Sequence, residues 1–291
     1  MKEYSIVIPT LNAGKYIKKL LDVLNSQSIR PNNILIVDSS SNDDTVSVIN
    51  SLNYDNVALV EIDRKEFDHG KTRDIAFRSL DDEIVVFMTQ DALPVDDICM
   101  EHLLEPFKDD DVAIVTARQI AYDFSSSYEK LVRQFNYPNI NRKWNKSDLS
   151  KLGINAYYIS DVCCAYRRSA YLEVGGFDYP VDTNEDMLIA QKLISSGYSI
   201  AYNADCKLYH SHDYSFARQF KRNYVIGRTL EKYKDRLKVG EVSKGSSLFK
   251  NVSKELIKQH KYLDLIRFFF DCVARFTGNR IGRLSWKINH K

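Results

Sequence analysis

Short apolar runs rich in β-branched residues alternate with helical patterns over the first 117 residues, and this order restricts the fold more than any other feature. The runs occupy residues 4–8, 34–37, 57–61, 84–88 and 112–117, and the helical patterns lie between them, at residues 16–24, 45–52, 72–79 and 98–107. A repeated strand–helix order predicts an α/β fold whose mostly parallel central sheet has helices on both faces. Because ligands of such sheets bind beyond the carboxyl ends of the strands, the polar residues after each run are the first candidates for a site.

The rest of the chain divides into two regions by pattern. Residues 118–160 are less regular, and we expect either a mobile loop over the site or a plain surface excursion there. Residues 161–213 return to short strands and one helix, at residues 186–195, which Gly197 closes as a C-terminal cap. Basic helical patterns with aromatic residues follow. The expected organisation is a domain at residues 1–213, with halves at 1–117 and 118–213, and a C-terminal helical extension at 214–291.

The net charge of +2 hides a strong asymmetry between these parts. Residues 1–213 hold 22 Lys/Arg and 33 Asp/Glu, a net −11, whereas residues 214–291 hold 19 and 6, a net +13. Basic helices with an aromatic, apolar face suit an anionic membrane surface, so we expect membrane contact through this region. Two alternatives stay open: the apolar faces pack on the rest of the chain, or they pair with a second copy in a homo-oligomer. Nucleic acid is not expected as a partner, because no nucleic-acid-binding module pattern is present.

The five cysteines, an odd number without any Cys-x-x-Cys spacing, indicate neither a disulfide framework nor a zinc site. The sequence shows no signal-peptide pattern, and no stretch reaches the roughly 18 uninterrupted apolar residues of a membrane-spanning helix. These patterns fit a reducing cytoplasm. We expect a cytoplasmic protein that binds peripherally to the inner face of the cell membrane.

Polar residues follow the first two apolar runs. The first run ends in Pro9, Thr10 and, one residue further on, Asn12. The second leads into Asp38, three serines and then an Asn-Asp-Asp sequence. A carboxylate at the carboxyl end of a strand can accept hydrogen bonds from a base or a ribose, so we expect Asp38 to contact a ligand. The later aspartates, Asp43 and Asp44, are better placed to cap the helix that follows.

A third polar segment, residues 67–74, reads Phe-Asp-His-Gly-Lys-Thr-Arg-Asp. Gly70 would let the backbone approach a phosphate, and a helix that begins near Thr72 would offer free amide donors and the positive end of its dipole. His69, Lys71 and Arg73 would add donors and positive charge at the same place, which suits a diphosphate.

Later carboxylates and histidines supply the remaining candidates. Asp91 follows the fourth apolar run in a Thr-Gln-Asp sequence, where a lone aspartate is usually a turn residue. His210 and His212 alternate, which places both on one face of a strand. Glu185 and Asp186 stand at the start of a helix, where carboxylates most often stabilise the helix dipole.

In this order, the segments resemble motifs of family 2 glycosyltransferases with the GT-A fold, and specifically of the rhamnosyltransferase branch. Residues 4–12 match the opening strand, and residues 37–45 match a Val-Asp-Asp-Gly-Ser-Thr-Asp-Asp-Thr motif, with Ser39 and Ser40 in place of the second aspartate and the glycine. Residues 67–74 match Phe-x-His-Gly-x-Thr-Arg-Asn, except that Asp74 replaces the asparagine. The Thr-Gln-Asp-Ala and His-Ser-His sequences also fit. The resemblance extends over about residues 4–222.

The resemblance implies a role for each candidate residue. It implies a catalytic domain with a nucleotide-binding half at residues 1–117 and an acceptor half at 118–213. A divalent ion, Mg²⁺ or Mn²⁺, would be held by Asp91 and His210, with His212 as the alternative histidine. Asp186 would activate an acceptor hydroxyl as the base, and Glu185 would hold an acceptor or donor hydroxyl. The implied contacts to the nucleotide and donor are Pro9, Thr10, Asn12, Asp38, Ser40, His69, Gly70, Arg73 and Gln90.

The activity implied by the resemblance is an inverting transfer of L-rhamnose from dTDP-β-L-rhamnose to a saccharide linked to a polyprenyl diphosphate, in bacterial cell-wall or capsular polysaccharide synthesis. One alternative is a related transferase with a UDP-hexose donor, because these motifs do not fix the base or the sugar. The alternative from another class is a non-catalytic membrane-surface subunit of a polysaccharide assembly complex. The acidic residues Asp91 and Asp186 argue against the second alternative.

Overall fold

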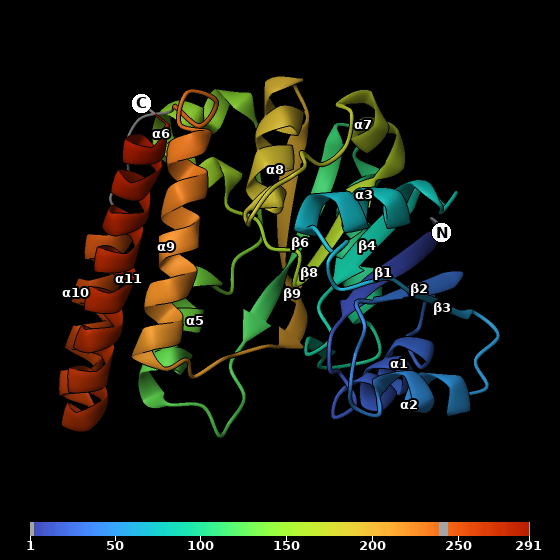
Figure 1. Cartoon of the computed structure of the whole chain (residues 1–291), viewed down its shortest axis with the longest axis horizontal. Helices are drawn as coiled ribbons and strands as arrows, with labels where there is room; N and C mark the ends of the chain where they lie inside the picture. The colour runs from blue at the N-terminus through green and yellow to red at the C-terminus, as the bar shows by residue number, and fades with distance from the viewer. Residues whose placement is uncertain (1–2, 239–243, 291) are drawn as a thin grey trace.

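The computed structural model describes residues 3–238 and 244–290, and it consists of a central sheet, helices on both of its faces and a layer of long C-terminal helices at one side (Figure 1). The strands are β1 (Tyr4–Thr10), β2 (Asn33–Asp38), β3 (Val57–Glu61), β4 (Ile84–Met88), β5 (Leu93–Pro94), β6 (Val112–Ile120), β7 (Arg142–Trp144), β8 (Cys163–Arg167) and β9 (Ser199–Tyr209). The α-helices are α1 (Ile17–Asn25), α2 (Thr45–Ser51), α3 (His69–Arg78), α4 (Cys99–Leu104), α5 (Ser127–Asn136), α6 (Leu149–Leu152), α7 (Arg168–Glu173), α8 (Glu185–Ser195), α9 (Phe216–Lys232), α10 (Lys244–Lys258) and α11 (Tyr262–Asn289).

The sheet has the strand order β3-β2-β1-β4-β8-β6-β9-β5, and β7 pairs with β9 off this path. β1, β2, β3, β4, β6 and β9 run in one direction, whereas β8, β5 and β7 run in the other. The prediction of a mostly parallel sheet is therefore confirmed. Because β1 pairs with both β2 and β4, the chain order reverses at β1, and a crevice at the carboxyl ends of such strands is where ligands bind in this class of fold.

The core lies on both faces of the sheet, as the near-continuous apolar strands predict. Along β1, Ile6 and Ile8 face α1, α2 and α4, whereas Val7 faces the helices on the other side. On that second face, Phe77 of α3 stacks on Tyr171 of α7 with ring centroids 3.7 Å apart. The expected helices on both faces are thus confirmed, and they hold the carboxyl ends of β1, β2 and β4 in fixed positions.

Residues 118–160 hold more regular structure than their sequence pattern indicated. They contain α5, α6 and β7, and α5 buries Tyr128 and Val132 against Val252 of α10 and Phe268 of α11. The segment is therefore not simply an excursion over the surface. It anchors the C-terminal helices, and it carries Arg133 toward the functional site described below.

The C-terminal layer is held together by close contact between α9 and α11. A Cβ atom at Gly278 would lie 2.5 Å from the carbonyl oxygen of Phe220, and one at Gly282 would lie 2.0 Å from that of Tyr224. Only glycine allows this backbone approach. The buried carboxylate of Asp271 accepts hydrogen bonds from Gln219 Nε2 (2.9 Å) and Arg275 Nε (2.6 Å), which adds a polar contact between the two helices. Within the described ranges, no helix is long and apolar enough to cross a membrane.

The α9–α11 contact predicts a large effect of a single methyl group. In Gly282→Ala the new Cβ would overlap the Tyr224 carbonyl, so we expect the free energy of unfolding to fall by about 1–3 kcal/mol. The matched control is Gly245→Ala in α10, where a Cβ meets open space and stability should stay unchanged or rise slightly. Thermal unfolding of the three proteins measures the difference. Equal midpoints for the two variants would show that α9 and α11 do not pack this closely.

Candidate active site

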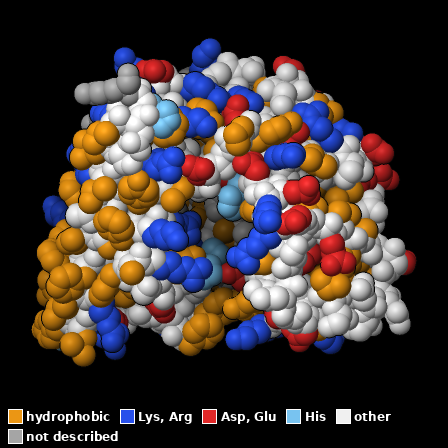
Figure 2. Space-filling view, viewed as in Figure 1, with side chains coloured by type: hydrophobic (Ala, Val, Ile, Leu, Met, Phe, Trp, Pro, Cys, Tyr) orange, Lys and Arg blue, Asp and Glu red, His pale blue; other side chains and the backbone are white. Residues whose placement is uncertain are grey.

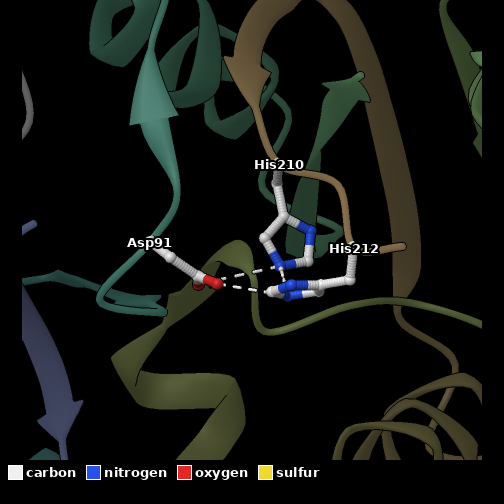
Figure 3. A group of neighbouring side chains, drawn as sticks. All are labelled: Asp91, His210 and His212. Atoms are coloured by element: carbon white, nitrogen blue, oxygen red, sulfur yellow. Dashed lines mark hydrogen bonds and ion pairs between the residues drawn. The ribbon is translucent and has the colours of Figure 1, made fainter. Parts of the chain in front are cut away.

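Three side chains from two strand ends meet in the first cluster of the site (Figure 3). Asp91 follows β4, and His210 and His212 follow β9. The Nε2 atom of His212 lies 3.1 Å from Asp91 Oδ2 and 3.1 Å from His210 Nε2, and His210 Nε2 lies 3.7 Å from Asp91 Oδ1. The structure thus brings together both residues implied as metal ligands and the alternative histidine.

His210 is oriented by a buried polar network from β6 and α5. Its Nδ1 lies 2.9 Å from Gln119 Oε1, which can only accept, so Nδ1 carries the proton and Nε2 keeps a lone pair toward Asp91. The orientation of Gln119 is fixed in turn, because its Oε1 also accepts from Arg133 and its Nε2 donates to Ser160 Oγ. Burial and the Arg133 charge lower the pKa of His210 to about 3, which keeps the ring neutral. Hydrogen bonding of this kind sets the tautomer of histidines that bind metals.

The geometry and chemistry of the cluster fit a divalent cation. Adjacent ligands of an octahedral ion with bonds of about 2.1 Å lie about 3 Å apart, close to the separations observed here. Burial by itself would raise the pKa of Asp91, but the His212 hydrogen bond and the interactions with the two imidazoles lower it to about 2, so the carboxylate is ionised at neutral pH. Two imidazoles and one carboxylate suit a transition metal better than Mg²⁺, which prefers oxygen ligands.

A second cluster surrounds the buried guanidinium of Arg73 on α3. Its Nη1 lies 3.2 Å from Glu185 Oε1, and its Nε lies 3.5 Å from Asp161 Oδ2. Burial and the charge of Glu185 raise the pKa of Asp161 to about 7, although Arg73 acts in the opposite direction. The motif resemblance gave Asp161 no role, and the signal available in the sequence was only its place just before a strand.

Asp186 belongs to this cluster but is more open than its neighbours. Glu185 is buried and paired with Arg73, whereas Asp186 is half-buried and accepts a hydrogen bond from the backbone N–H of Met187 at 2.7 Å. Burial, followed by the charges of Glu185 and Asp161, raises the pKa of Asp186 well above its usual value. The preceding residue, Asn184, has a left-handed backbone (φ 62°), and its Oδ1 is buried without a hydrogen-bond partner among the described residues. We had not assigned Asn184 from the sequence.

The two clusters approach each other through Arg133 and Tyr137. Arg133 Nη1 lies 3.4 Å from His210 Nδ1, and its guanidinium lies 5.9 Å from the centroid of the Tyr137 ring. The pKa of Tyr137 is raised overall, chiefly by burial. Arg133 acts to lower this pKa and Asp186 acts to raise it, so Tyr137 lies near a member of each side. Figure 2 shows the hollow into which histidines and basic side chains project, between the C-terminal helices and the N-terminal half. The carboxylates at positions 91 and 186 therefore belong to one connected polar region.

The predicted nucleotide-contacting residues around β1 and β2 are largely engaged with one another. Asp38 is fully buried, and its Oδ2 accepts from Thr10 Oγ1 at 2.8 Å and from Ser41 Oγ at 2.6 Å. A base or ribose that reached Asp38 would have to compete with these donors. The proposed ligand contact of Asp38 stays a prediction.

Four further predicted donor contacts lie at or near the ends of β1, β2 and β4. Gln90 accepts a hydrogen bond from the Leu11 N–H at 2.8 Å and donates to the Leu11 carbonyl at 3.1 Å, so its amide ties this loop to the end of β4. Asn12 and Ser40 are exposed and have φ values of 54° and 60°. The left-handed value at Ser40 explains why glycine is usual at this motif position. Pro9 is partly buried near the end of β1.

At α3 the structure corrects one expectation. The helix begins at His69, and the backbone N–H groups of Gly70 and Lys71 donate to the Asp68 carboxylate. The expectation of free amide donors near Thr72 is wrong for these two groups, because Asp68 caps the helix earlier. The structure gives a reason for glycine at position 70 that the sequence did not indicate: a Cβ there would lie 2.1 Å from the carbonyl oxygen of Asp178.

The side chains of α3 differ in what they can offer a ligand. His69 is half exposed and lies 3.9 Å from Glu185, and Lys71 is exposed. Asp74 is buried, accepts from Arg78 and Tyr171, and therefore has a structural role. Arg73 is almost completely buried by its two acidic partners.

Comparisons with known proteins agree with this fold. The family model "Glycosyl transferase family 2" matches residues 5–175, and the chain belongs to this family. It is 32% identical to the O-antigen chain rhamnosyltransferase RfbN of Salmonella typhimurium, over 96% of this chain and 89% of that protein. It is also 32% identical to the O-antigen chain rhamnosyltransferase WbaN of Salmonella anatum, over 97% of this chain and 90% of the relative.

Among solved structures, the mannosyltransferase PcManGT from Pyrobaculum calidifontis, in complex with GDP-Man and Mn²⁺, matches with a TM-score of 0.68 and 17% identity. The match covers all of this chain and 88% of that structure. At this identity the likeness shows the shared fold alone. The protein is thus a glycosyltransferase of family 2 with a GT-A fold.

The network behind His210 leads to a prediction about metal affinity. Gln119→Met removes the acceptor that orients His210 while keeping a similar side-chain volume, so we expect Mn²⁺ affinity to fall about 10–100-fold. The matched control is Gln259→Met, in the exposed turn after α10, and it should bind Mn²⁺ as the original protein does. Titration of Mn²⁺ followed by electron paramagnetic resonance measures both, and a thermal unfolding scan checks that each variant is folded. Unchanged affinity in folded Gln119→Met would mean that His210 is not a ligand.

Proposed function

We propose that this protein is an inverting rhamnosyltransferase that transfers L-rhamnose from dTDP-β-L-rhamnose to a saccharide linked to a polyprenyl diphosphate, at the inner face of the cell membrane. The choice of sugar is supported by the two rhamnosyltransferase relatives, which match nearly the full chain at 32% identity. The observation that carries the proposal is that two carboxylate clusters, one around Asp91 and one around Asp186, lie on either side of the contact between Arg133 and Tyr137.

In this proposal Asp91, His210 and His212 hold a divalent ion. When bound, the ion supplies positive charge to the diphosphate of the donor and of the departing dTDP. The two histidines favour Mn²⁺ over Mg²⁺, and the related mannosyltransferase structure contains Mn²⁺. Burial and the Arg133 charge keep His210 neutral, and Gln119 orients its ring, so its lone pair is available without loss of a proton.

The nucleotide part of the donor is assigned to the carboxyl ends of β1 and β2. Pro9, Thr10 and Asp38 form the floor of this region, and the loop residues Asn12 and Ser40 are exposed around it. Gln90 acts by holding the Leu11 backbone in place. From α3, His69 is open to the donor, whereas Gly70 and Arg73 keep the wall beside it packed.

Asp186 is the proposed base. The acceptor hydroxyl oxygen forms a bond to the anomeric carbon, its proton passes to the Asp186 carboxylate, and the bond from that carbon to the diphosphate breaks, so that dTDP leaves from the opposite face. A carboxylate with a raised pKa holds such a proton more readily than an ordinary aspartate. Glu185 is less suited to this step because Arg73 already pairs with it, and it is assigned to positioning a sugar hydroxyl.

Removal of the base should slow transfer far more than binding. For Asp186→Asn we expect kcat to fall about 10²–10⁴-fold with a small change in KM for the donor. Because only the ionised carboxylate acts as a base and its pKa is raised, the rate of the unchanged protein should fall as pH is lowered, starting well above pH 4. Release of dTDP measures both effects. Asp182→Asn, on an exposed aspartate four residues earlier, is the control and should keep normal transfer. Near-normal turnover in Asp186→Asn would exclude Asp186 as the base.

Donor choice can be tested without knowledge of the acceptor. With Mn²⁺ present, a donor at 100 times its Kd should stabilise the fold by about 2.7 kcal/mol, which raises the unfolding midpoint by several degrees. We expect this shift with dTDP-rhamnose and not with UDP-glucose or UDP-galactose, and we expect Asp91→Asn to lose the metal-dependent part. A shift with a UDP-sugar instead would replace rhamnose by a hexose donor. No shift and no metal-dependent hydrolysis with any donor would favour the non-catalytic alternative.

A further inference from the structure

The outer face of α11 is a long apolar surface without a partner among the described residues. We define the outer face as the side turned away from α9, where apolar side chains are 40–75% exposed. Its apolar members are Leu263, Ile266, Phe269, Phe270, Val273, Phe276, Ile281, Leu284 and Ile288. The opposite side of the helix carries Phe268, Asp271, Ala274, Gly278 and Gly282, which are buried. Because Gly278 and Gly282 touch the backbone of α9, the rotation of α11 is fixed and its apolar side must face outward.

Neighbouring helices extend this apolar surface. Phe249 of α10 is 39% exposed and lies near Phe269, with ring centroids 6.5 Å apart. Phe216 of α9 is 44% exposed and lies near Phe270, with centroids 5.9 Å apart. Figure 2 shows hydrophobic side chains gathered over the end of the molecule formed by α10 and α11. An aromatic surface of this extent is unusual for exposure to water and indicates a docking site.

The charges around the outer face are almost all positive. Residues 244–290 contain 10 Lys/Arg and three Asp/Glu. Of the three acids, Asp271 is buried, Asp264 is 17% exposed and lies 3.7 Å from Arg267, and Glu255 is partly buried. The basic side chains of α11 that are most exposed beside the apolar stripe are Arg267, Arg280 and Lys287. Arg267 has Asp264 as its acidic neighbour, and Lys287 Nζ lies 3.6 Å from Glu231 of α9, so basic side chains still outnumber acidic ones around this face.

This charge pattern decides between the two kinds of partner that could cover an apolar helix face. In a symmetric dimer through the outer face, each copy would bring arginines and lysines to the interface, and the same face of the other copy offers no fully exposed carboxylate to pair with them. Desolvating unpaired like charges opposes association. An anionic bilayer instead supplies phosphate groups to the basic side chains and an apolar interior to the aromatic ones.

We propose that the outer face of α11, with Phe249 and Phe216, is the surface by which the protein docks on anionic membranes. The helix would lie in the plane of the interface with its apolar stripe in the acyl boundary. This inference goes beyond the transfer reaction, and it does not depend on which donor is used.

The test compares matched apolar variants of the full chain. One variant is Ile266→Ser, Phe276→Ser and Leu284→Ser on the outer face, where the side chains are 55–62% exposed. The control is Val60→Ser, Ile75→Ser and Ile140→Ser, where they are 46–63% exposed and lie in the first 140 residues. Binding is measured by co-sedimentation with vesicles of phosphatidylcholine alone or mixed with phosphatidylglycerol. We expect the original protein and the control to bind the anionic vesicles, and the outer-face variant to bind at least roughly tenfold more weakly.

A second variant tests the electrostatic part. Arg267→Gln with Arg280→Gln should weaken binding to anionic vesicles about fivefold for each charge removed, and high salt should do the same to the original protein. Equal binding of all variants, or no binding by the original protein, would overturn the proposal. So would sedimentation of the original protein as a dimer that the outer-face variant converts to a monomer, because a second copy would then cover the face.

Transfer to a water-soluble acceptor separates this proposal from the proposed function. If the docking surface is as described, the outer-face variant keeps normal transfer to the soluble acceptor and loses it only toward a lipid-linked acceptor in vesicles. Failure of transfer by the original protein with every acceptor would count against the enzyme assignment and leave the vesicle binding result unaffected.

Discussion

The pairing of one buried guanidinium with two buried carboxylates is the interaction on which the Arg73 side of the candidate site depends. Arg73 comes from α3, Asp161 precedes β8 and Glu185 begins α8, so this contact joins three segments far apart in sequence. Loss of Arg73 would leave carboxylates buried without a counter-charge, which is far more costly than loss of an exposed ion pair. With Asp186 included, the cluster holds one positive charge and three acids. Burial, together with the repulsion between these acids, raises the pKa values of Asp161 and Asp186.

The other side of the site has the opposite electrostatics. Asp91 faces two histidines and has its pKa lowered to about 2, whereas Asp186 faces acids and has its pKa raised. In the proposed mechanism these two carboxylates have different roles, one remaining charged toward a cation and the other taking up a proton. The difference between the two pKa values comes from the surroundings of the carboxylates: Asp91 lies beside the two histidines that follow β9, and Asp186 lies half-buried in the first turn of α8, next to Glu185.

The alternation of apolar runs and helical patterns was enough to predict the first five long strands and both covered faces, because buried parallel strands must be apolar on both sides. The motifs also indicated Asp91, His210 and Asp186. What the sequence could not indicate was the support behind them. Gln119, Arg133 and Asp161 act through contacts between residues separated by 14 to 112 positions, such as Gln119 with Arg133 and Arg73 with Glu185, and no local pattern marks such pairs. The early start of α3 was missed because Asp68 reads equally well as a loop residue.

Helix α9 lies between the candidate site and α11, whose outer face is the proposed docking surface. Toward the site, Arg218 lies 4.4 Å from the centroid of the Tyr214 ring, and that ring stacks on His212. Toward the outside, the backbone of α9 touches α11 at Gly278 and Gly282. Since packed helices lie about 8–10 Å apart, only two helix layers separate the histidine cluster from the outer face of α11. A glycan several sugars long, held at the membrane by its lipid, could span that distance, so a protein docked through α11 would keep its site within reach of the acceptor.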